Sequence, residues 1–219
     1  MIEAVAFDLD GTLIESERRW EAARREVTES AGGTWRDDAQ PSMMGLSTPE
    51  WIPYMQRELG VQLEAEEIRR QVLQRLEAIY REDVPLIVGA REAVLRIGAR
   101  WPLAVASSSP RELIELVLGL AGLADAFEVV VSSAEVARGK PAPDVYLRAC
   151  ELLRSEAART AAIEDSGAGV RSASSAGMPV VLIPGTEFPP DRSALAQADL
   201  VLDSIAALDV AAIEGLVSD

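Results

Sequence analysis

The chain has 219 residues and a formal net charge of −15, and 48% of its residues are hydrophobic. This apolar fraction is typical of a globular protein with one sizeable core, and it excludes global disorder. The acidic balance argues against a general nucleic-acid binder, because such proteins neutralise phosphates with Lys and Arg. Histidine is absent, so mechanisms that need an imidazole base or an imidazole metal ligand are excluded.

No apolar run approaches the length of a membrane span, and the first residues lack the pattern of an export signal. Cys150 is the only cysteine, which rules out an internal disulfide framework. We therefore expect a cytoplasmic protein that binds neither membranes nor nucleic acid. The sequence leaves the oligomeric state open, and a monomer is compatible with it.

Short apolar runs predict the strands of a sheet. The first covers residues 2–7 and ends at Asp8, and others follow at 103–106, 127–131, 160–163 and 179–183, with a further candidate at 199–202. The runs do not alternate between apolar and polar residues, which is typical of strands covered on both faces. Helical patterns separate them, one of them starting at a predicted capping box, Ser109 to Glu112. This alternation predicts an α/β fold with a doubly wound parallel sheet, which binds ligands beyond the carboxyl ends of its strands.

Residues 15–85 break the alternation and contain only helical patterns. Trp20, Ala23 and Val27 form one apolar stripe, a stronger one runs from Ile68 to Tyr80, and Thr48-Pro49-Glu50 indicates a helix start between them. We therefore predict an all-helical cap at 15–85, inserted into a Rossmann-like core formed by 1–14 and 86–219.

Two carboxylates follow the first strand in the stretch FDLDGTL. Asp8 and Asp10 are two residues apart, so in an extended chain their side chains point the same way. Such a pair is costly unless a cation or a proton compensates it, which favours a bound metal. The alternative is that Asp10-Gly11 is only a turn, because Asp-Gly turns are common.

Polar residues also follow three later strands or lie close to them. Ser107 and Ser108 follow the strand at 103–106, and Glu164 and Asp165 follow the strand at 160–163. Lys140 is the only lysine beside twenty arginines, which indicates either a position that Arg cannot fill or a single lysine left by chance. Helix capping is the alternative for the serines that follow the strand at 103–106, and for Asp165 or Ser166 after the later strand.

Taken in order, FDLDGTL, Ser107, the KPAPD segment from Lys140 and the EDSGAG segment from Glu164 resemble the four signatures of haloacid dehalogenase-like hydrolases, in the phosphatase and β-phosphoglucomutase-like branch with a helical cap. The resemblance implies that Asp8 is the nucleophile, Asp10 the acid/base and Lys140 the phosphoryl-binding catalytic cation. It implies that Ser107 and Ser108 bind substrate. It also implies that Mg²⁺ is held by Asp8, Asp10, Asp165 and Glu164, the last as a ligand or through a neighbour.

The resemblance implies a Mg²⁺-dependent phosphatase of a small phosphorylated metabolite, such as a sugar phosphate or phosphoglycolate, that forms an aspartyl-phosphate at Asp8. A phosphosugar mutase is the alternative, although Thr48 stands where mutases have an Arg, and Trp20 where they have a His. Asp10 and Asp165 argue against a metal-free dehalogenase. The non-enzymatic alternative is a phospho-acceptor signalling module, which accepts phosphate on its third strand and lacks a helical insertion.

Overall fold

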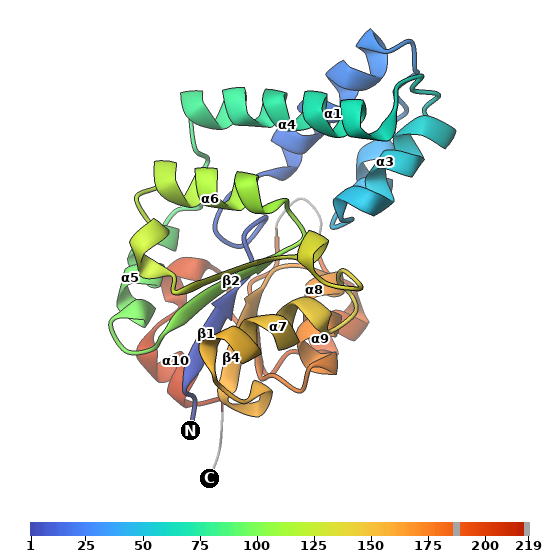
Figure 1. Ribbon diagram of the computed structural model, residues 1–219. Coiled ribbons are helices and arrows are strands. Elements are labelled where there is room, and N and C mark those ends of the chain that lie inside the picture. The colour runs from blue at the N-terminus through green and yellow to red at the C-terminus, as the bar shows by residue number, and fades with distance from the viewer. Residues whose placement is uncertain (186–188, 217–219) are drawn as a thin grey trace.

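A parallel sheet forms the centre of the molecule in the computed structural model, which describes residues 1–185 and 189–216 (Figure 1). Its six strands lie in the order β3 (Val129–Ser132), β2 (Leu103–Ser107), β1 (Ala4–Phe7), β4 (Thr160–Glu164), β5 (Val180–Leu182) and β6 (Leu200–Val201). Strand order changes direction between β1 and β4, where open α/β sheets bind their ligands. The predicted doubly wound fold is confirmed, and every predicted strand is present, the candidate at 199–202 included.

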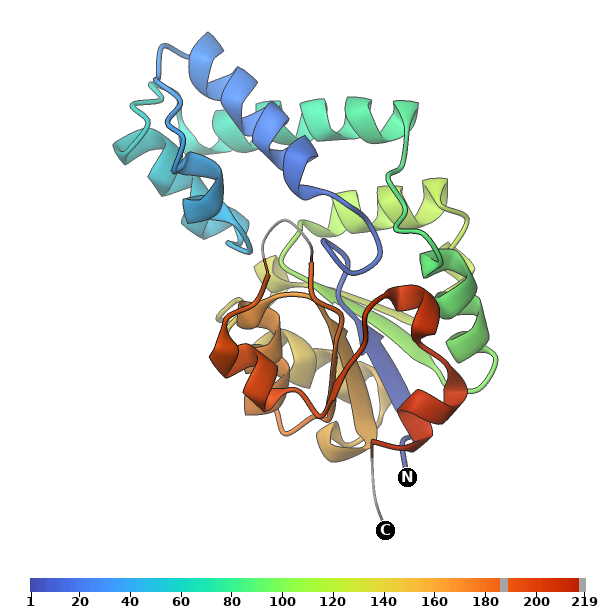
Figure 2. The same cartoon turned by 180° about the vertical axis from the view of Figure 1, so that it is seen from behind.

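Helices cover both faces of the sheet (Figures 1 and 2). One face packs against α5 (Ala90–Gly98), α6 (Arg111–Leu120) and α10 (Val210–Glu214), and the other against α7 (Asp144–Leu153), α8 (Gly167–Ser175) and α9 (Arg192–Gln197). Short 3-10 helices are η1 (Ala124–Ala126), η2 (Ser133–Glu135), η3 (Ala157–Arg159) and η4 (Ile205–Ala207). Within the described residues, none of the helices combines the length and the apolar character that a bilayer span needs.

The two faces of the sheet differ in side-chain size. Val5 and Phe7 of β1 point towards the α5 and α6 side, whereas Ala6 points towards α7 and α8. Ala104 of β2 and Ala162 of β4 share this second face, and all of these residues are fully buried. Side chains this short let the backbones of α7 and α8 lie close to the sheet.

Four helices between β1 and α5 form the inserted helical cap: α1 (Glu17–Ser30), α2 (Ala39–Met43), α3 (Thr48–Arg57) and α4 (Ala65–Glu82). They lie above the carboxyl ends of the strands, with α4 extending over α6 (Figure 1). Both predicted apolar stripes are buried, on α1 and on α4. The exact limits of the cap, 15–85, stay a prediction. The two chain connections between core and cap lie side by side, where Glu15 N donates to Pro85 O at 2.9 Å.

The predicted helix starts have different outcomes. Helix α3 begins as expected, and Ser47 N donates to the Glu50 carboxylate at 2.8 Å in a capping box. The capping box predicted at Ser109 is wrong, because α6 begins at Arg111 after Pro110 and no side chain caps it. The Ser109 hydroxyl is drawn away from the helix by a carboxylate, described below.

Candidate active site

The first carboxylate lies directly beyond β1. Asp8 N donates to Ile163 O of the neighbouring β4 at 2.9 Å, which continues the ladder by one residue and fixes the direction of the side chain. The Asp8 side chain is buried, with 6% of the residue exposed. The chain then turns through Gly11 at a φ of +88°, a conformation that favours glycine.

The second pair of carboxylates lies at the end of β4, where Glu164 is the last strand residue and Asp165 follows it. Phe7 and Ile163 are register partners, so Asp8 and Glu164 leave adjacent strands side by side. Asp8, Glu164 and Asp165, here called the acidic cluster, each offer one carboxylate oxygen within 4.8 Å of the others. Asp8 and Asp165 line a cavity, whereas Glu164 is fully buried beneath it.

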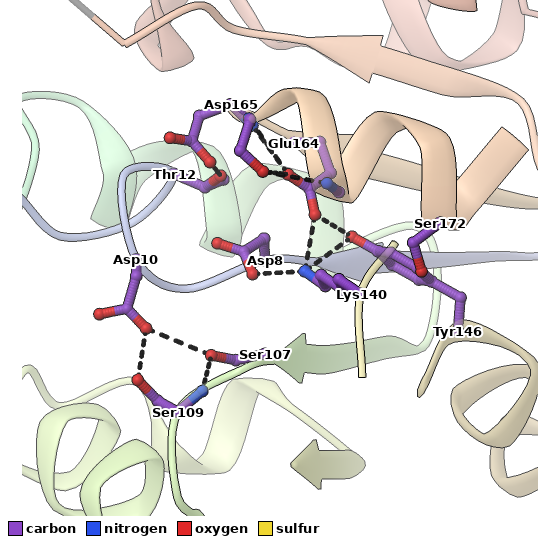
Figure 3. Close-up of polar contacts among 12 residues, drawn as sticks. Asp8, Asp10, Thr12, Ser107, Ser109, Lys140, Tyr146, Glu164, Asp165 and Ser172 are labelled. Carbon is purple, nitrogen blue, oxygen red and sulfur yellow. Dashed lines mark hydrogen bonds and ion pairs between the residues drawn. The ribbon is translucent and has the colours of Figure 1, made fainter. Parts of the chain in front are cut away.

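Lys140 reaches the acidic cluster from the loop before α7 (Figure 3). Its Nζ lies 2.6 Å from Asp8 Oδ1 and 2.6 Å from Glu164 Oε1. Tyr146 OH donates to the same Glu164 oxygen at 2.7 Å. The predicted Lys140 is thus brought together with Asp8, Glu164 and Asp165, although 24 or more residues separate it from each of them.

Electrostatics leave this region short of positive charge. Burial and the neighbouring carboxylates Glu164 and Asp10 raise the pKa of Asp8 well above its ordinary value, although Lys140 acts the other way. Burial, Glu164 and Asp8 likewise raise the pKa of Asp165. Burial opposes the charge on Lys140, but Asp8 and Glu164 outweigh it and raise the pKa of the ammonium group. Three carboxylates face one ammonium, an excess of two negative charges that a divalent cation would neutralise.

Glu164 uses both oxygens within the protein. Oε1 accepts hydrogen bonds from Lys140 and Tyr146, and Oε2 accepts hydrogen bonds from the backbone N–H groups of Asp165 and Ser166 at 3.1 and 3.3 Å. A Cβ added at Gly169 would lie 1.8 Å from its Oε1, so a glycine is needed there to leave room for the carboxylate. Glu164 therefore orients Lys140 and the loop that carries Asp165. Ser166 caps α8 by accepting from Gly169 N at 3.0 Å, one of the two capping possibilities that the sequence left open.

Asp10 points away from the acidic cluster, towards the end of β2 (Figure 3). Its Oδ2 accepts from Ser107 Oγ at 3.2 Å and from Ser109 Oγ at 2.6 Å. Its Oδ1 accepts from the indole N–H of Trp20, on cap helix α1, at 3.3 Å. Ser108 lines the cavity beside these residues. The cap thus contacts a core carboxylate directly.

A cavity of about 370 Å³, here called the cap–core cavity, lies between the helical cap and the sheet. Its walls include Asp8, Asp10, Lys140 and Asp165 from the core, and from the cap Glu17, Trp20, Arg24 and the Met44–Leu46 segment. This volume suits a small metabolite. The Asp8 carboxylate, the Asp10 carboxylate with its hydroxyl partners, and the Lys140 ammonium thus face one cavity.

Three residues of this region were missed by sequence reasoning. Ser109 was assigned to helix capping, yet it binds Asp10. Tyr146 is not singled out by the sequence analysis, and in the structure its ring packs against the Lys140 ammonium, with Nζ 4.9 Å from the ring centroid. Arg24 interrupts the apolar side of α1 as a charged residue within a buried stripe, and that interruption was the available signal.

Comparison with known proteins agrees with this geometry. The family model for haloacid dehalogenase-like hydrolases matches residues 2–177. The phosphorylated carbohydrates phosphatase of Thermotoga maritima is 34% identical over 179 residues, covering 81% of this chain and 82% of the relative. Hexitol phosphatase B of Escherichia coli is 31% identical over 210 residues, covering 94% of each. The crystal structure of CbbY from Rhodobacter sphaeroides in complex with phosphate superposes with a TM-score of 0.88 at 30% identity, covering 98% of this chain and 100% of that one.

Proposed function

The chain belongs to the haloacid dehalogenase-like hydrolase family and is a phosphatase of that family, and from this premise we propose that it hydrolyses a small phosphorylated metabolite, with Mg²⁺, through an aspartyl-phosphate at Asp8. The observation that carries the proposal is the contact of Asp8 with Lys140, 2.6 Å apart, in the wall of a cavity shared with Asp10 and Asp165.

The acidic cluster fits a magnesium ion. Its ligand atoms are carboxylate oxygens, the hard donors that Mg²⁺ prefers, and the charge excess matches a divalent cation. The side chains of Asp8 and Asp165, with the main-chain carbonyl of Asp10, would hold the ion, and Glu164 would support it from below. The bound ion would supply charge neutralisation between the attacking carboxylate and the substrate phosphoryl group.

Asp8 acts as the nucleophile in this proposal. A carboxylate oxygen of Asp8 attacks phosphorus, the bond from phosphorus to the ester oxygen breaks, and an aspartyl-phosphate forms. The Lys140 ammonium binds the phosphoryl oxygens in transit, while its contacts to Glu164 hold it beside Asp8. Ser108, in the cavity wall, and Ser107, buried at the end of β2, would support the phosphoryl group.

Asp10 acts as the general acid and then as the general base in this proposal. Protonated Asp10 gives its proton to the leaving ester oxygen and then, as a carboxylate, takes a proton from the water that attacks the aspartyl-phosphate. Cleavage of the bond between phosphorus and the Asp8 oxygen restores Asp8 and releases inorganic phosphate. Hydrogen bonds from Ser109 and Trp20 hold Asp10 in place for both steps.

The substrate is proposed from the relatives and the cavity together. Two relatives are phosphatases of phosphorylated carbohydrates and hexitols, and a cavity of about 370 Å³ accommodates a phosphorylated compound of that size. We place the present substrate in the same broad class of phosphorylated carbohydrate derivatives.

The proposal is tested by phosphate release from a panel of phosphorylated sugars, polyols and sugar acids, with Mg²⁺ and with EDTA. We expect release only with Mg²⁺, and none from Asp8→Asn protein that melts at the wild-type temperature. Acid-quenched wild-type protein should carry a base-labile phosphoryl group on the peptide that contains Asp8. Undiminished turnover by Asp8→Asn would refute the nucleophile, and stable phosphorylation without turnover would favour a signalling module. Transfer of the phosphoryl group to a second sugar hydroxyl, rather than to water, would favour a mutase.

A further inference from the structure

Arg24 is a buried cation in the cap wall of the cap–core cavity. Only 3% of the residue is exposed, and it lies on α1, one turn after Trp20. Its guanidinium carbon lies 4.5 Å from the centroid of the Trp20 ring and 5.2 Å from that of Trp51. Two indole rings therefore enclose a charged group that water reaches poorly.

The hydrogen-bonding capacity of this guanidinium is largely unused. Its Nη1 donates a long hydrogen bond, 3.4 Å, to Gln40 Oε1, and the buried Nε has no partner among the described residues. A guanidinium has five N–H groups and stays charged, so burial without partners is costly. Such a group is expected to meet an acceptor that arrives with a ligand.

The charge on Arg24 is also under-compensated. Burial lowers the pKa of its guanidinium to about 10, and the nearby carboxylates Glu17 and Asp10 offset this effect only in part. Gln40 is neutral and also holds Glu17, through a hydrogen bond of 2.6 Å to Oε2. The region around Arg24 thus favours an added negative charge, in a protein whose net charge is −15.

Arg24 lies on the leaving-group side of the site. The Trp20 ring separates it from Asp10, since the indole stacks under the guanidinium at one face and donates to Asp10 Oδ1 at 3.3 Å. Asp10 is the proposed proton donor to the leaving oxygen, so groups attached to that oxygen extend past Trp20 towards the cap. A remote group of the substrate would meet Arg24 there.

We propose that Arg24 binds an oxyanion on the leaving group, a carboxylate or a second phosphate, and that the substrate is therefore a phosphate monoester with a second acidic group. The inference rests on the proposed function and narrows its substrate class. A planar guanidinium binds either oxyanion through two parallel hydrogen bonds, which a lysine could not provide. A polyol phosphate without a second acidic group would leave the buried charge of Arg24 compensated only in part, by Glu17 and Asp10.

The test compares matched substrates that differ only in the remote group: sorbitol 6-phosphate against 6-phosphogluconate, and glucose 1-phosphate against glucose 1,6-bisphosphate. We expect wild-type kcat/KM to favour the acidic member of at least one pair by roughly tenfold to a hundredfold, the effect of a charged hydrogen bond. Arg24→Met should abolish that ratio, and Arg24→Lys should restore part of it. The first pair reports a carboxylate and the second a phosphate.

Arg25→Met is the matched control. Arg25 neighbours Arg24 on α1 but is exposed, pairs with Glu21 at 3.3 Å and stacks on Trp35, so its loss should leave the ratio unchanged. Thermal melting separates binding from a structural role. If Arg24 only holds the cap together, Arg24→Met lowers the melting temperature and slows all substrates equally. If it awaits an anion, the ligand-free variant melts no lower than the wild type.

Binding to Asp8→Asn protein, which cannot turn over, makes the test independent of catalysis. Stabilisation by 6-phosphogluconate should exceed that by sorbitol 6-phosphate, or that by glucose 1,6-bisphosphate should exceed glucose 1-phosphate, and Arg24→Met should remove the difference. Equal stabilisation within both pairs would overturn the role of Arg24 even if phosphatase activity is present. Absence of magnesium-dependent hydrolysis with a persistent binding preference would overturn the proposed function and would leave only the binding of an oxyanion by Arg24 supported.

Discussion

Replacing Glu164 with Gln tests how the cation of the site is held in place. The carboxylate is fully buried, and it receives Lys140 at 2.6 Å and Tyr146 at 2.7 Å on one oxygen and donors from Asp165 and Ser166 on the other. Glutamine keeps the shape but offers one acceptor oxygen and one NH2 group. Whichever way the amide turns, its NH2 group faces donors.

The cost is the difference between two opposing effects. Breaking a buried ion pair from one side costs roughly 3–5 kcal/mol, because a charge is left without its partner. Here Lys140 retains Asp8, and removal of the Glu164 charge relieves its repulsion of Asp8, so the lower end applies. We expect the free energy of unfolding to fall by about 3 kcal/mol. For a chain of this size the melting temperature should then fall by about 6–12 °C.

The assay is thermal unfolding followed by circular dichroism in EDTA, combined with Mg²⁺ titration of the same proteins. Glu151→Gln is the control, because Glu151 is exposed on α7 and its carboxylate pairs with Arg148 at the surface, at 2.6 Å, so its loss should change stability by less than about 0.5 kcal/mol. We expect Glu164→Gln to lower kcat strongly through displaced Lys140 while Mg²⁺ affinity changes less than tenfold.

Two results would refute this reasoning. A melting temperature within 2 °C of the wild type corresponds to a change of roughly 1 kcal/mol or less in the free energy of unfolding, and it would show that the buried ion pair is energetically neutral. A loss of Mg²⁺ affinity beyond about a hundredfold, with stability retained, would show instead that Glu164 is a direct ligand of the ion.

Three further predictions concern the same site. Gly11→Ala should abolish Mg²⁺ binding and activity, because the added Cβ would lie 2.0 Å from Asp165 Oδ2. Gly60→Ala is the control: Gly60 has a similar φ of +74° with nothing within 4 Å, so the variant should cost only about 1 kcal/mol of backbone strain. Equal Mg²⁺ affinities of the two variants would contradict the role assigned to Gly11. Ser109→Ala should lower kcat about tenfold with little change in KM, since Asp10 loses a hydrogen bond of 2.6 Å, and an unchanged kcat would show that this bond does not position Asp10. Mg²⁺ should raise the melting temperature more at pH 8 than at pH 5.5. Because the pKa values of Asp8 and Asp165 are raised, the folded protein keeps protons that the unfolded chain loses near pH 3.8, and stability in EDTA therefore falls as pH rises through the folded pKa values. A bound cation takes the place of those protons, so its stabilising effect grows as they are lost. A melting-temperature rise that is independent of pH would contradict that linkage.

The sheet could be predicted because buried parallel strands leave a clear pattern. Runs such as Leu103–Ala106 are apolar throughout, and the polar residues that follow them mark the edge where ligands bind. The positions of Asp8 and Asp165 were accessible for the same reason, because the carboxyl ends of parallel strands lie along one edge of the sheet. Lys140 lies in the loop before α7, and it stood out instead as the only lysine of the chain. Their roles as nucleophile, cation and metal ligand stay predictions for the experiments above.

The cap contacts could not be predicted, because they depend on how the helical layer is placed over the sheet. Trp20 has the spacing of a core residue on α1, and its indole N–H nevertheless reaches Asp10. Ser109 stands at a position typical of a helix cap, and a competing carboxylate captures its hydroxyl. Local propensity fails in both cases because the deciding partner comes from a distant part of the chain.

The solitary lysine has a practical consequence. Apart from the terminal α-amino group, Lys140 is the sole primary amine in the chain, and it is enclosed by Asp8, Glu164 and Tyr146. Because the ammonium group is held in two ion pairs, an acylating reagent used in slight excess can modify Lys140 only when its contacts to Asp8 and Glu164 separate. The rate of that single modification, measured by intact-protein mass spectrometry, would therefore report how often these ion pairs separate.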